Sequence, residues 1–504
     1  MDQTYLIGLD AGTTSVKGLL TDLEGSRQTI VQKEYSLNYK GGQMVELDPE
    51  VYWEATVRII GQLLVKSGIR SEQVKALAFS SQGETLIAVD RDGRPLRKAI
   101  IWLDNRSEKE AREIEDNFGK QAVLEKTGQP EIIPMWPATR LLWLRKNEPA
   151  IFKQTAKFVL VEDYLVACLT GQFKCAESMA SSTLYFDIRK KEWWGDMMDF
   201  LHISPDRLPQ VVPSGTPVGT ISKAVAEATG LAPGTVVVTG AYDHPAGAIG
   251  AGNIHEGMVS ETTGTAMAMC VTLDRPVLDP SLNLPCQCHA VPGKYLLLPY
   301  GQTAGLVLRW FRDVFCAEEQ VEAEKSGRKV YDIITGLAAN IPAGANGLVM
   351  LPHFMGAGPP EFDVHIKGVF AGITPEIKKG HFIRAIMEAI ASMINRNLET
   401  LTSHNIAVKE IRALGGGAES DLWNQIKADL TGIPYITTCS GETACLGAAI
   451  LAGAGSGYLK DIQEGCTRLV KQKKIFIPDQ EQHEVYKVIY NQYVKLYEHL
   501  KGYW

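Results

Sequence analysis

The segment Leu6-Ile-Gly-Leu-Asp10-Ala-Gly-Thr-Thr-Ser15-Val-Lys-Gly-Leu-Leu-Thr-Asp22 decides how this 504-residue chain folds. Two apolar runs of β-type residues flank a short turn, so the segment predicts a β-hairpin whose tip carries chemistry. Gly12 lets the backbone approach a ligand closely, and consecutive turn amides can point at an anion.

The side chains around this turn indicate a phosphate and Mg²⁺ site in a nucleotide-using enzyme. The carboxylate of Asp10 could hold Mg²⁺ directly or through its waters. The hydroxyls of Thr13, Thr14 and Ser15 add donors, and Lys17 adds a positive charge. The segment lacks the Gly-Lys-Ser/Thr ending of a P-loop. By itself it also fits an ordinary tight hairpin without a ligand.

Length and composition favour a globular protein with more than one core. A chain of 504 residues exceeds the roughly 250–300 residues at which single cores stop growing, so we expect two large domains. Hydrophobic residues at 45% and charged residues at 22% argue against wholesale disorder. The net charge of -7 disfavours broad nucleic-acid binding.

Other sequence features predict a cytoplasmic protein with no membrane partner. The apolar strand begins almost at once, so we expect no secretion signal, and no apolar run reaches the roughly 18–20 residues of a membrane span. Nine scattered cysteines favour reduced thiols. Cys286-Gln-Cys288-His289 resembles half of a metal site, but without a second pair a structural zinc is disfavoured.

Two clusters of polar side chains follow predicted strands in the first half of the chain. The strand at 74–80 leads into Ser81-Gln-Gly-Glu-Thr85, and the strand at 99–102 leads into Asp104-Asn-Arg106. Their carboxylates and amides, with an indole that can stack on a sugar, suit a polyhydroxylated ligand. Solvated loop charges and a core tryptophan are the alternative. The candidate contacts are Gln82, Glu84, Trp102 and Asp104.

The opening pattern returns in the second half of the chain. Residues 258–269 again read as strand, Thr-Gly-Thr turn and strand, which suggests a duplicated domain with a second phosphate turn at Gly264 and Thr265. Two unrelated hairpins remain the alternative.

The region before this repeat supplies one further candidate. Residues 107–230 are predicted mainly helical. Asp243 then follows a strand where a helix begins, a position at which open α/β sheets present ligand-binding groups.

Three further helices are predicted around these strands. Asp48-Pro-Glu50 is typical of a helix start, and a long amphipathic helix begins near Gly380. Small residues fill a helix from Glu442 to Gly453. A strand at 411–414 enters Gly415-Gly-Gly417, whose side-chain-free surface and following helix N-terminus suit a base or ribose.

The ordered motifs resemble the FGGY carbohydrate kinase family, the sugar and polyol kinases of the actin-like ATPase fold. Residues 10–15 look like its first phosphate loop, Gly264-Thr265 like its second, and Gly415-Gly-Gly417-Ala like its adenosine motif. Gly240-Ala-Tyr-Asp243 matches the segment with the catalytic aspartate, and residues 368–388 match the C-terminal signature. The N-terminal signature near 135–141 departs, because Arg140 stands where a lysine is usual.

The resemblance implies an α/β fold of two actin-like ATPase (ribonuclease H-like) domains, each a mixed sheet flanked by helices, with the active site in the interdomain cleft. It implies a sugar-binding domain over 1–252 and a nucleotide-binding domain over 253–504. The reaction would be ATP-dependent phosphorylation of a primary hydroxyl of a small sugar or polyol, with Mg²⁺. A homodimer is left open.

The resemblance also assigns residue roles. Asp243 is the expected catalytic base and Asp10 the expected metal ligand. The expected substrate contacts are Gln82, Glu84, Trp102, Asp104, Asp243 and His244. The expected nucleotide contacts are Gly12, Thr13, Thr14, Ser15, Lys17, Gly264, Thr265, Gly305, Gly416, Gly417 and Asp421.

Substrate choice within the family is less defined. Glycerol kinases read Arg-Glu-Thr where this chain has Gly83-Glu-Thr85 and a tyrosine where it has Met135, while xylulokinases read Met-His at the first of these places. The lost arginine and tyrosine leave a roomier pocket, which favours a pentulose such as xylulose. Glycerol, a tetritol, ribulose and fuculose remain alternatives, as do a noncatalytic sugar/ATP sensor and an ATP-driven conformational protein.

Overall fold

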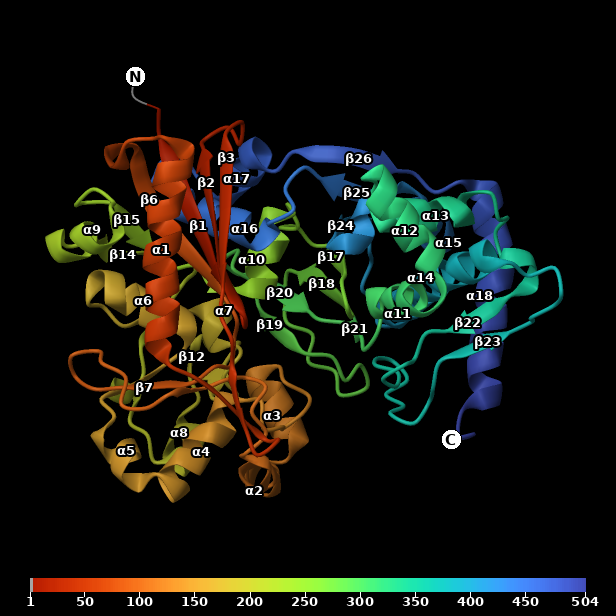
Figure 1. The fold of residues 1–504 in the computed structure, drawn as a ribbon. Helices are drawn as coiled ribbons and strands as arrows, with labels where there is room; N and C mark the ends of the chain where they lie inside the picture. Colours follow the sequence, from red (N-terminus) through yellow and green to blue (C-terminus); the bar gives the residue numbers. More distant parts are fainter. Residues whose placement is uncertain (1–2) are drawn as a thin grey trace.

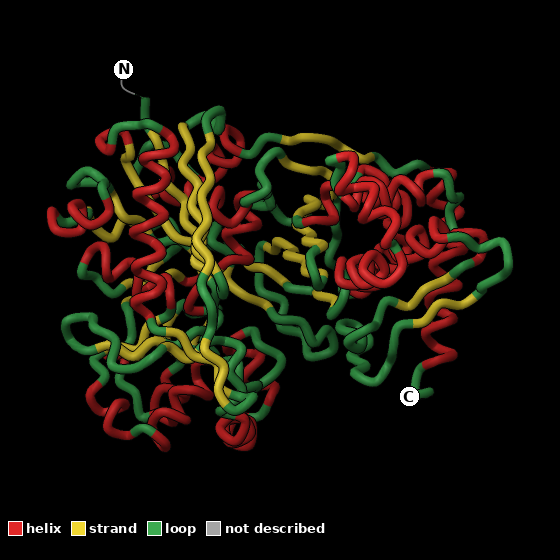
Figure 2. The backbone as a smooth tube through the Cα atoms, in the orientation of Figure 1, coloured by secondary structure: helices red, strands yellow, loops and turns green. Residues whose placement is uncertain are grey.

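Two mixed β-sheets, one in each half of the chain, organise the computed structural model, which describes residues 3–504 (Figures 1 and 2). Across the first sheet the strands follow the order β14 (Pro217–Thr220), β15 (Val236–Val238), β6 (Val74–Ser81), β1 (Tyr5–Ala11), β2 (Ser15–Asp22) and β3 (Gln28–Glu34), with β16 (Ala241–Tyr242) paired to β6. The predicted opening hairpin is the β1–β2 pair, in which Asp10 lies opposite Lys17.

The second sheet repeats the arrangement of the first. Its strands follow the order β19 (Cys286–Cys288), β20 (Tyr295–Leu297), β18 (Met267–Leu273), β17 (Met258–Thr263), β24 (Glu410–Leu414), β25 (Tyr435–Thr438) and β26 (Gln472–Phe476), with β21 (Tyr300–Gly301) paired to β18. In each sheet an antiparallel hairpin, β1–β2 or β17–β18, pairs in parallel with the next central strand, β6 or β24. The shared topology confirms the predicted duplication.

Strand β1 is buried on both faces, which explains its continuous apolar run. Tyr5, Ile7 and Leu9 pack into a core with helices α1 (Pro49–Ser67) and α6 (Val161–Thr170). Leu6 faces the opposite way and packs against helix α16 (Thr443–Gly455). Successive strand residues point to opposite faces, so one strand serves two cores.

Helices α10 (Asp243–Gly250) and α16 pack against each other between the two sheets. The blue helix α16 lies beside the red strands β1 and β2, although it belongs to the second half of the chain (Figure 1). At the crossing, a Cβ atom on Gly250 would lie 1.8 Å from the Thr443 carbonyl oxygen, and one on Gly447 would lie 1.9 Å from the Ala246 carbonyl oxygen. Only glycine permits backbones to approach so closely.

Smaller elements enclose the first sheet on its lower side in Figure 1. The region 107–230 is mainly helical as predicted, with short strands between its helices. The smaller elements of the first half are β4 (Asn38–Lys40), β5 (Met44–Leu47), β7 (Ile87–Val89), β8 (Ala99–Ile100), α2 (Glu108–Phe118), α3 (Lys120–Thr127), α4 (Pro137–Asn147), α5 (Pro149–Gln154), β9 (Lys157–Val159), β10 (Lys174–Ala176), α7 (Glu177–Ala180), β11 (Phe186–Asp187), β12 (Glu192–Trp193), α8 (Gly195–Leu201), β13 (Gln210–Val212) and α9 (Lys223–Thr229). Of these, α9 lies beside β14 and β15 and not below the sheet (Figure 1).

A helical layer covers the second sheet on the right of Figure 2. Its elements are α11 (Gly305–Phe315), α12 (Ala317–Ser326), α13 (Val330–Ala339), β22 (Val349–Leu351), β23 (Val369–Ala371), α14 (Lys379–Ser403), α15 (Asp421–Thr431) and α18 (Gln480–Leu500). Helix α17 (Ile462–Leu469) lies away from this layer and packs against α16 (Figure 1). The predicted helix starts are close: Asp48 caps α1, and α14 and α16 begin within one residue of the expected positions. Within residues 3–504 we find no helix with the length and apolarity needed to cross a membrane.

Candidate active site

A cavity of about 320 Å³ lies where the two halves of the chain meet. The first half contributes mostly polar and aromatic residues, which are Thr13, Gln82, Glu84, Trp102, Trp136, Tyr242, Asp243 and His244, together with Gly83 and Met135. The second half contributes Ala268, Met269, Pro285, Gln287, Leu298, Pro299 and Tyr300. We call this space the acceptor cavity. A few polar groups set among aromatic and apolar walls are typical of a small-molecule site.

The hairpin tip is joined to the polar strand ends by hydrogen bonds. The Trp102 indole Nε1 donates to the Thr13 hydroxyl at 2.8 Å, and that hydroxyl donates to the Gln82 Oε1 at 3.3 Å. Gln82 in turn donates to the Tyr52 hydroxyl at 2.6 Å. The turn around Gly12 is therefore fixed to the wall of the acceptor cavity.

Asp10 lies at the end of β1 with its carboxylate held below the turn. Its Oδ1 accepts a hydrogen bond from the Ser80 hydroxyl at 2.8 Å. Burial raises the pKa of Asp10 to about 6, and the nearby Asp243 carboxylate adds to the increase, whereas the Ser80 hydrogen bond and Lys17 oppose it. A cation bound next to this carboxylate would stabilise its ionised form.

Glu84 is almost fully buried in the wall of the acceptor cavity. Burial raises the pKa of its carboxyl to about 8, with a further increase from Asp243 and a decrease from Arg140. Near neutral pH the protonated carboxyl is therefore a hydrogen-bond donor as well as an acceptor. Its backbone has a left-handed φ of 57°, uncommon for a residue that is not glycine.

Arg140 holds this wall in place from behind. Its guanidinium donates to the backbone carbonyl oxygens of Glu84 and Trp102, both at 2.7 Å, and of Asp104 at 3.3 Å. The side chain is fully buried, and burial lowers its pKa to about 9. The arginine that departs from the family signature therefore ties together the two loops that carry predicted substrate contacts.

Asp243 is the first residue of α10, where β16 ends. Its side chain is 40% exposed toward the cavity, and one carboxylate oxygen lies 3.4 Å from His244 Nδ1. That oxygen is buried, and this burial raises the pKa of Asp243, while His244 opposes the increase. The carboxylate is thus accessible to a ligand in the acceptor cavity.

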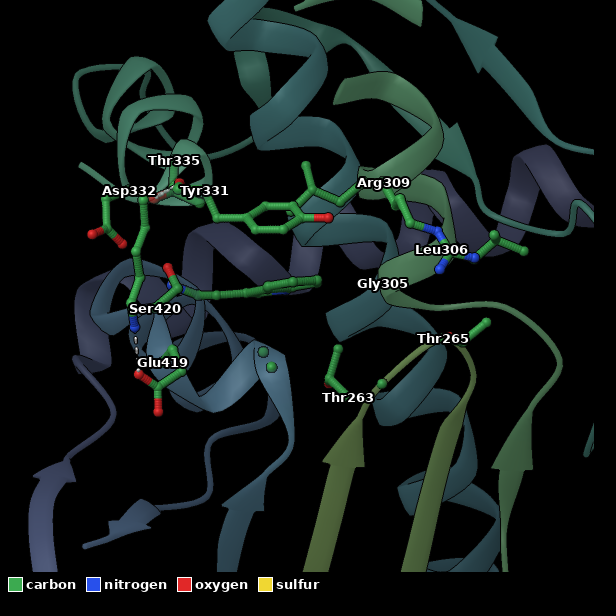
Figure 3. A pocket seen from close by; sticks show the side chains of 16 residues that line it. Thr263, Thr265, Gly305, Leu306, Arg309, Tyr331, Asp332, Thr335, Glu419 and Ser420 are labelled. Carbon is green, nitrogen blue, oxygen red and sulfur yellow. Dashed lines mark hydrogen bonds and ion pairs between the residues drawn. The ribbon is translucent and has the colours of Figure 1, made fainter. Parts of the chain in front are cut away.

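A second cavity, of about 330 Å³, lies entirely in the second half of the chain. We call it the nucleotide cavity. In Figure 3, Tyr331 and Arg309 extend into the space above Thr263 and Thr265, and Glu419 borders it on another side. Lys329 lies 3.6 Å from Glu419, so an ion pair spans part of the wall. The remaining lining residues are Gly264, Gly305, Leu306, Leu308, Asp332, Thr335, Gly416, Gly417, Ser420 and Trp423.

Glycines allow the walls of this cavity to come together. The Gly305 amide donates to the Gly264 carbonyl oxygen at 2.8 Å, and a Cβ atom on Gly305 would lie 2.6 Å from that oxygen. A Cβ on Gly417 would lie 2.5 Å from the Thr263 side chain. The second turn, the start of α11 and the glycine run therefore meet at one place.

A buried ion pair supports the second turn from below. Lys427 of α15 lies 2.7 Å from the Glu261 carboxylate and donates to the Thr263 hydroxyl at 2.6 Å, and both charged side chains have no exposed area. Thr263 also donates to Glu261. Buried charges need such partners, so the strand end that carries the turn is tightly held.

Most predicted site residues lie at these two cavities, but some do not. Asp104 is fully buried and its carboxylate accepts from the Val45 amide and from Arg106. Asp421 pairs with Lys474 at 2.7 Å and its side chain is 69% exposed. Since both carboxylates are engaged outside the cavities, we remove them from the proposed contacts. Polar residues at predicted strand ends identified the loops near the cavities, but the sequence did not show which of their side chains point into a cavity.

Other residues near the turns have partners that the sequence did not reveal. Lys17 pairs with Glu442 of the second half at 2.8 Å, which leaves its ammonium partly neutralised. Gly12, Thr14 and Ser15 lie at the hairpin tip and line neither cavity. In the suspected zinc cluster, Cys288 Sγ accepts a hydrogen bond from the Lys191 ammonium at 2.8 Å. His289 Nε2 lies 3.0 Å from the Asn253 carbonyl oxygen. Those contacts argue against a metal site there.

Sequence reasoning missed several lining residues. Tyr242, Gln287 and Tyr300 line the acceptor cavity, and Arg309 and Tyr331 line the nucleotide cavity. Tyr242 directly precedes the predicted Asp243, so its position was a usable signal. Gln287 lies inside the Cys286-Gln-Cys288-His289 cluster, which the sequence analysis considered only as a metal site. Tyr300, Arg309 and Tyr331 lie in sequence surroundings that resemble ordinary core or helix surface.

Comparison with known proteins places this geometry in a family. The N-terminal-domain model of the FGGY family of carbohydrate kinases matches residues 5–250, and the C-terminal-domain model matches residues 259–456. The chain belongs to the FGGY family of carbohydrate kinases. It is therefore a carbohydrate kinase, a phosphotransferase with an alcohol group as acceptor, and kinases of this family use ATP as the phosphate donor.

Individual relatives cover nearly the whole chain. A protein named xylulose kinase from Staphylococcus epidermidis is 32% identical over 99% of this chain and 98% of its own length. One named autoinducer-2 kinase from Enterobacter sp. (strain 638) is 31% identical, covering 96% and 92%. The crystal structure of a gluconate kinase from Lactobacillus acidophilus superposes with a TM-score of 0.88 at 27% identity, covering 99% of both chains. The named acceptors of these relatives differ.

Proposed function

We propose that this FGGY kinase transfers the γ-phosphoryl group of ATP to a primary hydroxyl of a pentulose such as xylulose. The observation that carries the proposal is the place of Asp243, whose accessible carboxylate lies in the wall of a cavity shared by both halves of the chain. The glycine-walled nucleotide cavity in the second half supplies a separate space for ATP.

In the proposed reaction Asp243 accepts the proton of the acceptor hydroxyl. The hydroxyl oxygen forms a bond to the γ-phosphorus, and the bond from that phosphorus to the bridging oxygen breaks, so that ADP leaves with the electron pair. A loose transition state develops charge late on the nucleophile, and a carboxylate is a sufficiently strong base for it. The backbone amides and side-chain hydroxyls at Thr13, Gly264 and Thr265 are the proposed hydrogen-bond donors to the ATP phosphates.

The chain's carboxylates fit a hydrated Mg²⁺. Asp10 is partly buried, and both this burial and the nearby Asp243 carboxylate raise its pKa, which is the electrostatic setting that a hard cation relieves. Within residues 3–504 no group of three or more His, Cys, Asp or Glu side chains gathers as an all-protein cage. Mg²⁺ bound to ATP needs only one or two carboxylates, because phosphates and waters complete its shell. When bound, it would neutralise phosphate charge.

The shape of the acceptor cavity supports an acceptor larger than glycerol. Gly83, Met135 and Ala268 leave its walls without a charged or bulky polar side chain at those positions. Glu84, Gln82 and His244 offer hydrogen bonds to several hydroxyls, and Trp102 offers an aromatic face. The xylulose kinase name of a whole-length relative supports the same class.

The test is ADP release with Mg-ATP and a panel of acceptors. The panel contains xylulose, ribulose, fuculose, a tetritol, a pentitol, gluconate and glycerol. We expect a pentulose to give the highest kcat/KM. A higher value with glycerol or gluconate would overturn the pentulose assignment while leaving the kinase activity intact.

We expect Asp243→Asn to reduce kcat by about 10²- to 10⁴-fold, the usual contribution of a general base. Binding of sugar and ADP, measured by calorimetry, should change little because asparagine has the same shape. Asp92→Asn is the matched control, since Asp92 is 66% exposed and pairs only with the neighbouring Arg94. Unchanged turnover in Asp243→Asn would exclude the proposed base.

A further inference from the structure

Gln287 is the one residue of the suspected Cys-Gln-Cys-His cluster that lines the acceptor cavity. It lies on β19 between Cys286 and Cys288, which both point into the core of the second half. Because side chains alternate along a strand, Gln287 faces the other way. Its partner across the ladder is Leu296, which packs with Ala248 of α10 at the junction between the halves.

The side-chain amide oxygen of Gln287 is buried without a hydrogen-bond partner. The residue is 2% exposed, and its Oε1 has no hydrogen bond from any group in the described chain. The residues from its own half that line the same cavity are largely apolar, among them Pro285, Met269 and Leu298. Buried amides in native proteins are nearly always hydrogen-bonded, so an unpaired one beside a cavity calls for a ligand group.

Resting on the proposed function, we propose that Gln287 is a specificity-determining residue that hydrogen-bonds a hydroxyl of the acceptor sugar other than the one phosphorylated. Asp243 belongs to the first half and serves the reacting hydroxyl, whereas Gln287 belongs to the second half. A sugar that engages both must span the junction. Only an acceptor long enough to present two separated hydroxyls can bind both residues. Such an acceptor contacts both halves of the chain when it binds.

The free and bound proteins should respond differently to loss of this amide. In the free protein an apolar side chain of similar length removes an unsatisfied buried group, which is neutral or stabilising. In the complex the same change leaves a sugar hydroxyl unpaired in an apolar wall. A site built to bond a hydroxyl discriminates strongly when that bond is lost.

The experiment is Gln287→Leu, with sugar binding and thermal unfolding measured on the whole chain. We expect kcat/KM for xylulose to fall by about 10- to 100-fold, mainly through KM, with the KM for ATP unchanged. The Tm without ligands should stay equal or rise. The stabilisation of Tm by added xylulose, without nucleotide, should become smaller than in the unaltered protein.

Gln129→Leu is the matched control. Gln129 is also fully buried with an unpaired Oε1, but its Nε2 donates to the Ser181 carbonyl oxygen at 3.0 Å and it lies outside the acceptor cavity. This change should lower Tm and leave the KM for xylulose unchanged. A lowered Tm in Gln129→Leu but not in Gln287→Leu separates a structural amide from a ligand-binding one.

Two results would overturn the role of Gln287. One is a lowered Tm in Gln287→Leu with unchanged KM, which shows a structural amide. The other is an equal loss for xylulose and for glycerol, which shows a general disturbance of the reaction and not recognition of a second hydroxyl. If the unaltered protein phosphorylates and binds none of the panel sugars, the proposed function fails first, and that failure is seen without any variant.

Discussion

The buried carboxyl of Glu84 in the acceptor cavity makes the stability of the folded protein depend on pH. Its pKa rises from 4.5 to about 8 because burial disfavours the charged form. Below pH 4.5 the carboxyl is protonated in both folded and unfolded chains. Between pH 4.5 and about 8 the unfolded chain releases the proton and the folded chain keeps it. This contribution to stability is therefore lost as the pH rises through that window.

We expect Glu84→Gln to remove this pH dependence. Relative to the variant, the unaltered protein should lose up to about 1.4 kcal/mol of unfolding free energy per pH unit between pH 5 and 8. Urea unfolding at pH 5, 6.5 and 8 measures the difference. Glutamine keeps the shape and removes the charge, so the two proteins should converge at the lowest pH. Parallel profiles across the range would mean that Glu84 is ionised in the folded chain.

At the scale of elements, the crossing of α10 and α16 decides how the halves meet. Both helices consist largely of small residues, which allow two helices to approach closely. The structure shows close packing at Gly250 and Gly447, where backbone faces backbone. Helix α16 belongs to the second half in sequence but packs on the first sheet, and the predicted division at residue 252 does not describe this helix.

We expect Gly447→Ala to destabilise the protein by about 1–3 kcal/mol, because the added methyl group would overlap the Ala246 carbonyl oxygen. Gly61→Ala is the control, since a Cβ atom there meets nothing within 4 Å inside helix α1. That change should stabilise by about 0.5–1 kcal/mol through helix propensity. Thermal unfolding of both variants tests the pair, and an equal response would contradict close backbone packing at the crossing.

At the scale of the whole molecule, two cavities must cooperate across the junction. The acceptor cavity has walls from both halves, whereas the nucleotide cavity has walls from the second half alone. Lys17 and Glu442 already pair across the junction at 2.8 Å. Phosphoryl transfer requires the γ-phosphate to reach Asp243, so a relative movement of the halves is expected to bring the substrates together and exclude water.

We expect ATP hydrolysis without sugar to be at least about 100-fold slower than sugar phosphorylation, because water in the open site is poorly placed for attack. Solution X-ray scattering should show a smaller radius of gyration only when xylulose and a nonhydrolysable ATP analogue are present together. Each ligand alone is the control. If ATP turnover is equal in the presence and absence of each sugar, closure of the two halves does not protect ATP from hydrolysis.

The sequence by itself determined the local features. Apolar runs around a glycine turn predicted both hairpins, because strand and turn preferences act over a few residues. The repeated strand-turn-strand pattern indicated the duplicated sheets, and a strand ending before Asp243 located the proposed base. Together with the family resemblance, these short-range signals were sufficient for the kinase assignment and for part of the lining of each cavity, such as Glu84 and Asp243 in one and Gly264 and Gly417 in the other.

Tertiary structure decided which side chains share a space. The pairing of Lys17 with Glu442 joins residues 425 positions apart, and no local pattern encodes it. The burial of Asp104 and the exposure of Asp421 depend on what packs beside each loop. Gln287 faces the acceptor cavity only because the register of β19 turns its neighbours into the core. Contacts of this kind arise from packing over the whole chain, which propensity and spacing do not contain.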